Sequence, residues 1–129
     1  MKKVIILAVM LLVAMVSGNS YAQTAKALTP SIGGKTTGSS ITKAASVAAG
    51  KIALNVTDKK VSFFMMAYKN KLQNVELISN SENLTTEMKN AINAMATGTV
   101  VTFAKIACKP VSNANAAPER VGEFTITIQ

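Results

Sequence analysis

The side chains that most often perform chemistry are scarce in this sequence. The chain has 129 residues, no His and a single Cys, Cys108. Without His, a zinc hydrolase or a Ser-His or Cys-His nucleophile pair cannot be built. Only Lys105 and Lys109 lie near enough in sequence to lower the pKa of the Cys108 thiol, and one Cys excludes an intramolecular disulfide. We expect Cys108 to be a buried, small hydrophobic side chain, with an intermolecular disulfide as the alternative.

Other patterns that suggest chemistry fail on spacing. Gly34-Lys35-Thr36 matches the end of a phosphate-binding loop, but Thr29 stands where the first Gly is required. Met65 and Met66 could suggest a soft-metal site, yet neighbouring residues of a strand point to opposite faces. The acidic residues are spread over expected turns, a helix start and an outward strand face: Asp58, Glu76, Glu82, Glu87, Glu119 and Glu123. We therefore predict no catalytic, cofactor-binding or metal-binding residues, no cofactor and no enzymatic activity.

The N-terminus has the pattern of a secretory signal peptide. Lys2 and Lys3 precede an uncharged apolar run over residues 4–16, and small residues lead to a cleavage position after Ala22. The run is shorter than the roughly 20 residues of a relaxed bilayer crossing. We predict a cleaved signal over residues 1–22, no stable transmembrane span afterwards, and a protein that is periplasmic, secreted or associated with the cell envelope.

The charge balance indicates a solvated, Lys-rich surface that keeps an exported protein soluble and lightly attracts anionic envelope polymers or lipid headgroups. The chain carries 14 Lys+Arg against 6 Asp+Glu, and removing Lys2 and Lys3 leaves 12 against 6. The basic residues are nearly all Lys and are spread along the chain without interleaved aromatic residues, which argues against nucleic acid as a partner. The Lys excess leaves open the binding of an anionic glycan or lipid surface.

Composition and periodicity predict one small domain. Residues 23–30 are interpreted as a linker and residues 31–129 as the domain, with a helical turn over 41–49 that stops at Gly50. Apolar alternation predicts five strands, separated by turns at 58–60 and 69–71 and by a loop at 109–120. The strands are expected at residues 51–56, 61–68, 72–79, 99–108 and 121–128.

One clear helix is predicted after the third of these strands. Its apolar stripe consists of Leu84, Met88, Ala91, Ile92 and Met95. Thr85 or Asn83 is expected to cap its start, and Thr97-Gly98 to end it. A stripe at this spacing is typical of a helix that packs on a sheet.

The strand at 61–68 is apolar on both faces. We expect it to be central and packed on both sides, because such a strand at an edge would aggregate. One face is predicted to carry Val61, Phe63, Met65 and Ala67, and the other Phe64, Met66 and Tyr68. The elements together predict a mainly β fold, an antiparallel β-sandwich with one short α-helix, or alternatively an α+β antiparallel sheet with the helix on one face.

Several short segments, read in order, resemble the C-terminal domain of the gliding motility-associated protein GldM over about residues 30–129. They are Gly33-Gly34-Lys35, Gly38, Ile41-Thr42-Lys43-Ala44, Ala48-Ala49-Gly50, Val61-Ser62-Phe63, Thr86-Glu87-Met88-Lys89, Thr97-Gly98-Thr99-Val100, Phe103, Ile106 and Phe124-Thr125-Ile126-Thr127-Ile128. The resemblance implies an immunoglobulin-like module in the periplasm of Bacteroidetes, at the distal end of a dimeric shaft of the type IX secretion and gliding machinery. It implies no enzymatic activity and no ligand residues.

GldM itself begins with a membrane helix and several further domains, whereas this chain begins with a cleavable type of signal. We therefore predict a non-enzymatic, exported cell-envelope protein-interaction module, an adaptor linked to the gliding and type IX secretion machinery. Edge strands or the loop at 109–120 are expected to contact an envelope protein, and an oligomer stays open. The alternative is a small secreted module that binds anionic glycan or lipid surfaces through its Lys excess.

Overall fold

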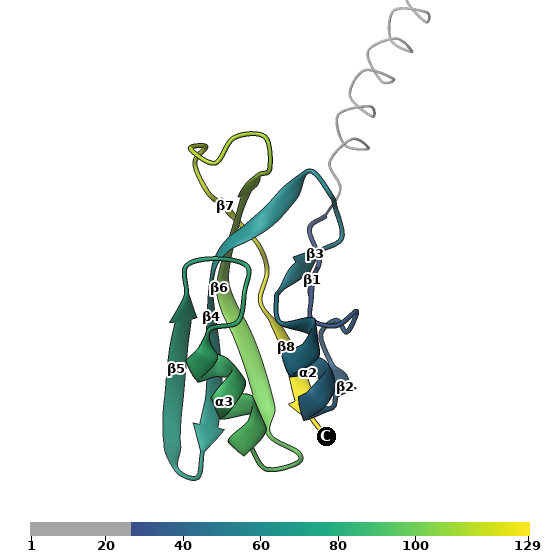
Figure 1. Cartoon of the computed structure of the whole chain (residues 1–129), viewed down its shortest axis with the longest axis vertical. Helices are drawn as coiled ribbons and strands as arrows, with labels where there is room; N and C mark the ends of the chain where they lie inside the picture. The colour runs from purple at the N-terminus through teal and green to yellow at the C-terminus, as the bar shows by residue number, and fades with distance from the viewer. Residues whose placement is uncertain (1–26) are drawn as a thin grey trace, which may run out of the picture.

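The structure, a computed structural model, describes residues 27–129 (Figure 1). The predicted signal peptide at 1–22 and most of the predicted linker at 23–30 lie outside the described residues. The elements in chain order are β1 (Pro30–Ser31), β2 (Ser39–Ile41), α2 (Lys43–Ala49), β3 (Ala53–Leu54), β4 (Lys59–Asn70), β5 (Gln73–Ser79), α3 (Thr86–Ala94), β6 (Val100–Pro110), β7 (Glu119–Arg120) and β8 (Phe124–Ile128).

The strands form one large and one small sheet. The large sheet has six strands in the order β2-β8-β6-β4-β5, with β7 paired to β6. All its pairings are antiparallel except that of β2 with β8, which is parallel. The small sheet pairs β1 with β3. Both helices lie on one face of the large sheet (Figure 1). The predicted mainly β, antiparallel, sandwich-like fold with a short helix is confirmed, and α2 is a second short helix.

Each helix begins and ends where its local sequence dictates. The Thr42 hydroxyl oxygen accepts a hydrogen bond from the Ala45 N–H at the start of α2, and the left-handed Gly50 ends that helix. The Thr85 hydroxyl oxygen accepts in the same way from the Met88 N–H at the start of α3. These caps confirm Gly50 and Thr85 in the predicted roles. Helix α3 ends at Ala94, before the predicted stop.

Three phenylalanines form the centre of the core. The ring of Phe103 on β6 stacks on that of Phe124 on β8 at a centroid distance of 5.0 Å, and meets that of Phe64 on β4 edge to face at 6.0 Å. Met88 and Ile92 of α3 are fully buried in the same cluster. The apolar stripe of α3 is therefore core, as predicted.

Strands β4 and β6 each carry a β-bulge at the same level of the sheet. Between the pairs Val61↔Cys108 and Met65↔Ala104 the register shifts twice, first through an extra residue in β4 and then through one in β6. The bulged part of β6 lies between Ala104 and Ala107 and contains Lys105, whose φ of 52° is left-handed. This conformation costs a residue with a Cβ on the order of 1 kcal/mol. Because the two insertions cancel, the strands keep one common register on either side of the bulges.

The bulges decide which side chains enter the core. Val61 and Phe64 are both buried although strict alternation would place them on opposite faces, and the same holds for Phe103 and Ile106. The prediction that Val61 shares a face with Phe63 is wrong, because the extra residue in β4 turns Val61 to the core side.

Hydrogen-bonded pairing also extends β4 and β6 beyond the apolar segments from which these strands were predicted. The predicted turns at 58–60 and 69–71 are largely strand, because Lys59 pairs with Pro110 and Asn70 pairs with Gln73. The predicted loop at 109–120 is shorter in the structure and covers residues 111–118, because β6 extends to Pro110 and β7 begins at Glu119.

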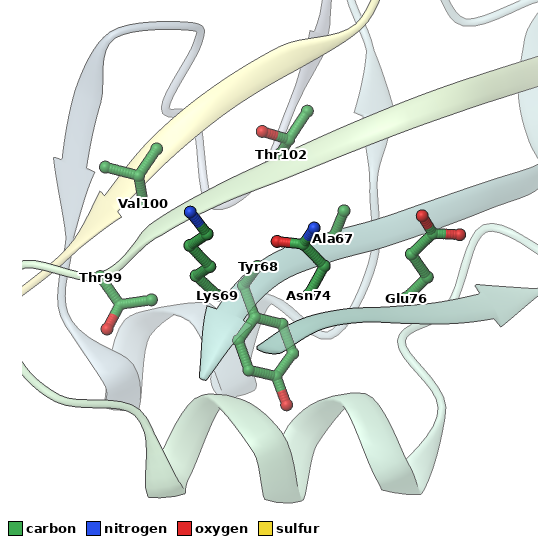
Figure 2. A pocket seen from close by; sticks show the side chains of 8 residues that line it. All are labelled: Ala67, Tyr68, Lys69, Asn74, Glu76, Thr99, Val100 and Thr102. Carbon is green, nitrogen blue, oxygen red and sulfur yellow. The ribbon is translucent and has the colours of Figure 1, made fainter. Parts of the chain in front are cut away.

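Strand β4 is central, between β5 and β6, as predicted. Its prediction as a strand packed on both sides is wrong for part of its length. In residues 27–129 both helices lie on one face of the sheet (Figure 1), the face on which Phe64 packs in the core cluster with Met88 of α3. Ala67, on the other side, lies in an open hollow (Figure 2). Met65 is nevertheless only 9% exposed. This uncovered side is called the open face below.

Candidate functional site

The outer edge of β5 is a candidate binding surface. Strand β5 pairs only with β4, so the other side of Gln73–Ser79 presents free backbone donors and acceptors within the described part of the chain. The strand contains neither Pro nor Lys, the usual protections of an edge, and Glu76 is its single charged residue. Leu72, in the turn just before β5, is 95% exposed, and Ile78 within the strand is 55% exposed. The edge is thus open to an added strand.

A shallow hollow of about 430 Å³ adjoins this edge on the open face. Figure 2 shows Lys69, Asn74, Glu76 and Thr102 on the hollow side of the sheet, while Tyr68 points to the other side, toward α3. The lining combines amide, hydroxyl and oppositely charged groups on a flat sheet. Such a surface suits the side chains of a protein partner better than a small substrate, which would need a deeper site.

A second hollow, of about 400 Å³, lies at the bulges and is called the basic hollow below. Its charged lining consists of Lys105 and Lys109 of β6 and Arg120 of β7. Phe63, Asn80 and Pro118 also line it. An adjoining hollow of about 350 Å³ shares Lys109 and is lined by Lys60 and Glu82 as well. This arrangement can hold an anion.

The neighbouring acidic side chain of β7 is already paired. The Lys59 ammonium lies 3.1 Å from one carboxylate oxygen of Glu119, the only ion pair found within residues 27–129. The hydrogen bond that the Lys59 ammonium donates to this carboxylate raises the pKa of Lys59. Glu119 and Arg120 are adjacent on a strand, so their side chains point to opposite sides of the sheet.

The single cysteine is not a reactive group in this fold. Cys108 is fully buried in β6, which confirms its predicted place as a small core side chain. Burial raises the pKa of its thiol, with the nearby Glu119 carboxylate acting in the same direction and Lys59 in the opposite one. The nucleophilic thiolate is disfavoured.

The structure also places the incomplete phosphate-loop pattern, and it bears on metal binding and membrane crossing. Gly33 and Gly34, with φ of 55° and 78°, form a tight turn closed by hydrogen bonds between Ile32 and Lys35, and not a phosphate-binding loop. In residues 27–129 no group of three or more His, Cys, Asp or Glu side chains could hold a metal ion. Within the same range, every helix is too short or too polar to span a bilayer.

Comparison with known proteins leaves this geometry as the main evidence. No protein-family model matches the chain. No curated protein matches it at a significant level.

The basic hollow was not predicted from the sequence. In the sequence, Lys105, Lys109 and Arg120 are separated from one another and belong to basic residues that are spread along the chain. One signal was present: Phe103 and Ile106 are both large and apolar at a spacing that a regular strand cannot bury on one face. Such a break in alternation indicates a bulge, and a bulge redirects the side chain at its centre.

Proposed function

We propose that the protein is a non-enzymatic, exported cell-envelope module that binds another protein by β-strand addition at the β5 edge. The observation that carries this proposal is the outer edge of Gln73–Ser79, which is unpaired within residues 27–129, at the rim of a sheet whose other long strands are paired on both sides. An extended segment of a partner would continue the sheet through backbone hydrogen bonds, and the exposed Ile78 would contact its side chains.

The cellular setting of the proposal comes from the sequence. The signal pattern at residues 1–22 supports export, and the resemblance to the GldM C-terminal domain supports an adaptor linked to the gliding and type IX secretion machinery of Bacteroidetes. Both stay predictions, together with the periplasmic or secreted location and any oligomer.

The direct experiment is in-cell crosslinking followed by affinity purification and mass spectrometry. The tag belongs directly after Ala22. The C-terminus is unsuitable, because β8 lies inside the sheet and the Gln129 N–H donates to the Ile41 carbonyl oxygen at 2.9 Å. We expect envelope proteins to be recovered. Deletion of the gene is expected to impair secretion or gliding; normal secretion and gliding would refute the link to that machinery.

A matched pair of variants tests the edge itself. Ile78→Lys places a charge in the edge strand, which opposes strand addition. Val111→Lys makes the same change at a side chain of nearly equal exposure, 56% against 55%, in the 111–118 loop. Loss of the crosslinked partner in Ile78→Lys alone would support the β5 edge. Loss in Val111→Lys alone would move the contact to the loop, and retention in both would contradict both surfaces.

A further inference from the structure

Three cationic side chains line the basic hollow, and no acidic side chain of the described residues lines it with them. Lys105, Lys109 and Arg120 line it, and within residues 27–129 none of the three forms an ion pair. The Lys109 ammonium donates to the Ala114 carbonyl oxygen at 3.3 Å, which orients this side chain through the 111–118 loop. The nearest acidic residue of β7, Glu119, is paired with Lys59 instead.

The backbone brings these like charges together against their mutual repulsion. Lys60 and Lys109 are directly opposite each other on β4 and β6, an arrangement that destabilises a sheet. Arg120 is opposite Ala107, and therefore next to Lys109 on the same side of the sheet. Lys105 has no pairing partner on β4 and adopts a left-handed backbone conformation in the bulge. A bound anion would relieve the repulsion that the strand pairing imposes.

We propose that the basic hollow binds a phosphate monoester. A phosphate monoester carries close to two negative charges at neutral pH, and three cations in one hollow match a dianion better than a single carboxylate. The guanidinium of Arg120 can engage two of its oxygens at once, and the two ammonium groups act as point charges beside it. Phe63 and Pro118 line the same hollow and offer an apolar surface to the organic part of the ester.

The basic hollow gathers part of the Lys excess of the sequence at one site. The hollow lies on the β6–β7 side of the sheet, whereas the proposed protein contact lies at the β5 edge. Anion binding and protein binding can therefore be tested independently. The phosphate can belong to a soluble ester or to an acidic lipid headgroup, and the two sources share the chemistry that the hollow recognises.

The test is a titration of the purified protein followed by amide NMR, in about 150 mM salt to screen diffuse charge. The probes are inorganic phosphate, glycerol 3-phosphate and vesicles of phosphatidic acid in phosphatidylcholine. We expect saturable shifts at the amides of Ala107 and Arg120. Binding of the soluble esters would assign a free phosphate ligand, and binding of the vesicles alone would assign a lipid headgroup.

Two lysines allow a closely matched control. Lys105→Gly removes one charge at a left-handed position that Gly tolerates, so the bulge is kept. Lys71→Gly makes the same change at the only other left-handed non-Gly position of the described residues, in the β4–β5 turn at the far end of β4 (Figure 1). We expect at least a tenfold loss of affinity in Lys105→Gly and in Arg120→Gln, and less than a twofold change in Lys71→Gly.

Two results would overturn the proposal. One is the absence of saturable binding for all three probes, and the other is equal weakening by Lys71→Gly and Lys105→Gly, which would indicate diffuse attraction. If Lys105→Gly does not fold, Arg120→Gln decides the question, because the Arg120 side chain is exposed and belongs to a strand of two residues.

Discussion

Deletion of Lys105 is the most direct perturbation of the paired bulges. Phe103 and Ile106 are both buried although they are three residues apart, and removing Lys105 places them two apart, the spacing at which a regular strand buries both. Ile106 and Cys108 therefore stay on the core side. The extra residue of β4 remains as a single bulge, so the two strands can keep their pairing on either side of it.

The expected loss is small because the buried side chains keep their places. Ile106 and Cys108 are both fully buried. If Ile106 turned out of the core, its exposure would cost about 1.5–3 kcal/mol, and the cavity would bring the loss to roughly 3–5 kcal/mol. With Ile106 in place, and with a left-handed residue removed, we expect the free energy of unfolding to fall by less than about 1 kcal/mol. The melting temperature should fall by less than roughly 8 °C.

The assay is urea and thermal unfolding followed by circular dichroism. A second deletion, of Ser62, removes the extra residue of β4 and should cost little more than the single deletion, because both strands then alternate regularly. Deletion of Ser112 in the exposed 111–118 loop is the control, and should cost less than about 1 kcal/mol. A loss of roughly 3–5 kcal/mol on deleting Lys105 would mean that Ile106 and Cys108 had left the core, and would refute the reasoning.

Three further predictions concern single side chains. The buried Ser79 hydroxyl donates to the Asn83 carbonyl oxygen at 2.6 Å, so Ser79→Ala should lower the free energy of unfolding by about 1–3 kcal/mol in urea titrations. Thr85→Ala removes the cap of α3 and should cost about 1 kcal/mol by the same measurement, whereas Thr86→Ala, one residue on, should cost less than half of that. Because burial raises the folded-state pKa of Cys108, the unfolded thiol ionises first, so stability should decline as pH rises above about 8.5; urea titrations from neutral to alkaline pH should show a shallower decline in Cys108→Ala. Native Cys108 should also resist iodoacetamide until denaturant is added, and rapid native labelling would contradict its burial.

Local features of this protein were readable from its sequence. The Thr caps, the left-handed Gly50 and the apolar stripe of α3 act within a few residues, so both helices were anticipated, α2 as a helical turn. Apolar alternation likewise predicted β5 and β8 as strands. The predicted ends of the strands were less accurate, because pairing with β6 extends β4 to Lys59 at one end and pairing with β5 extends it to Asn70 at the other.

The sequence by itself determined that the chain forms a β-rich domain with a helix on its core, since alternation and helical periodicity are properties of neighbouring residues. Only the tertiary structure decided the rest. The parallel pairing of β2 with β8 joins the two ends of the domain, and no local pattern encodes it. The free edge of β5 is a consequence of strand order. The basic hollow depends on two bulges that cancel in register and on a loop that returns Arg120 beside Lys109, so its charges meet only when distant segments pair.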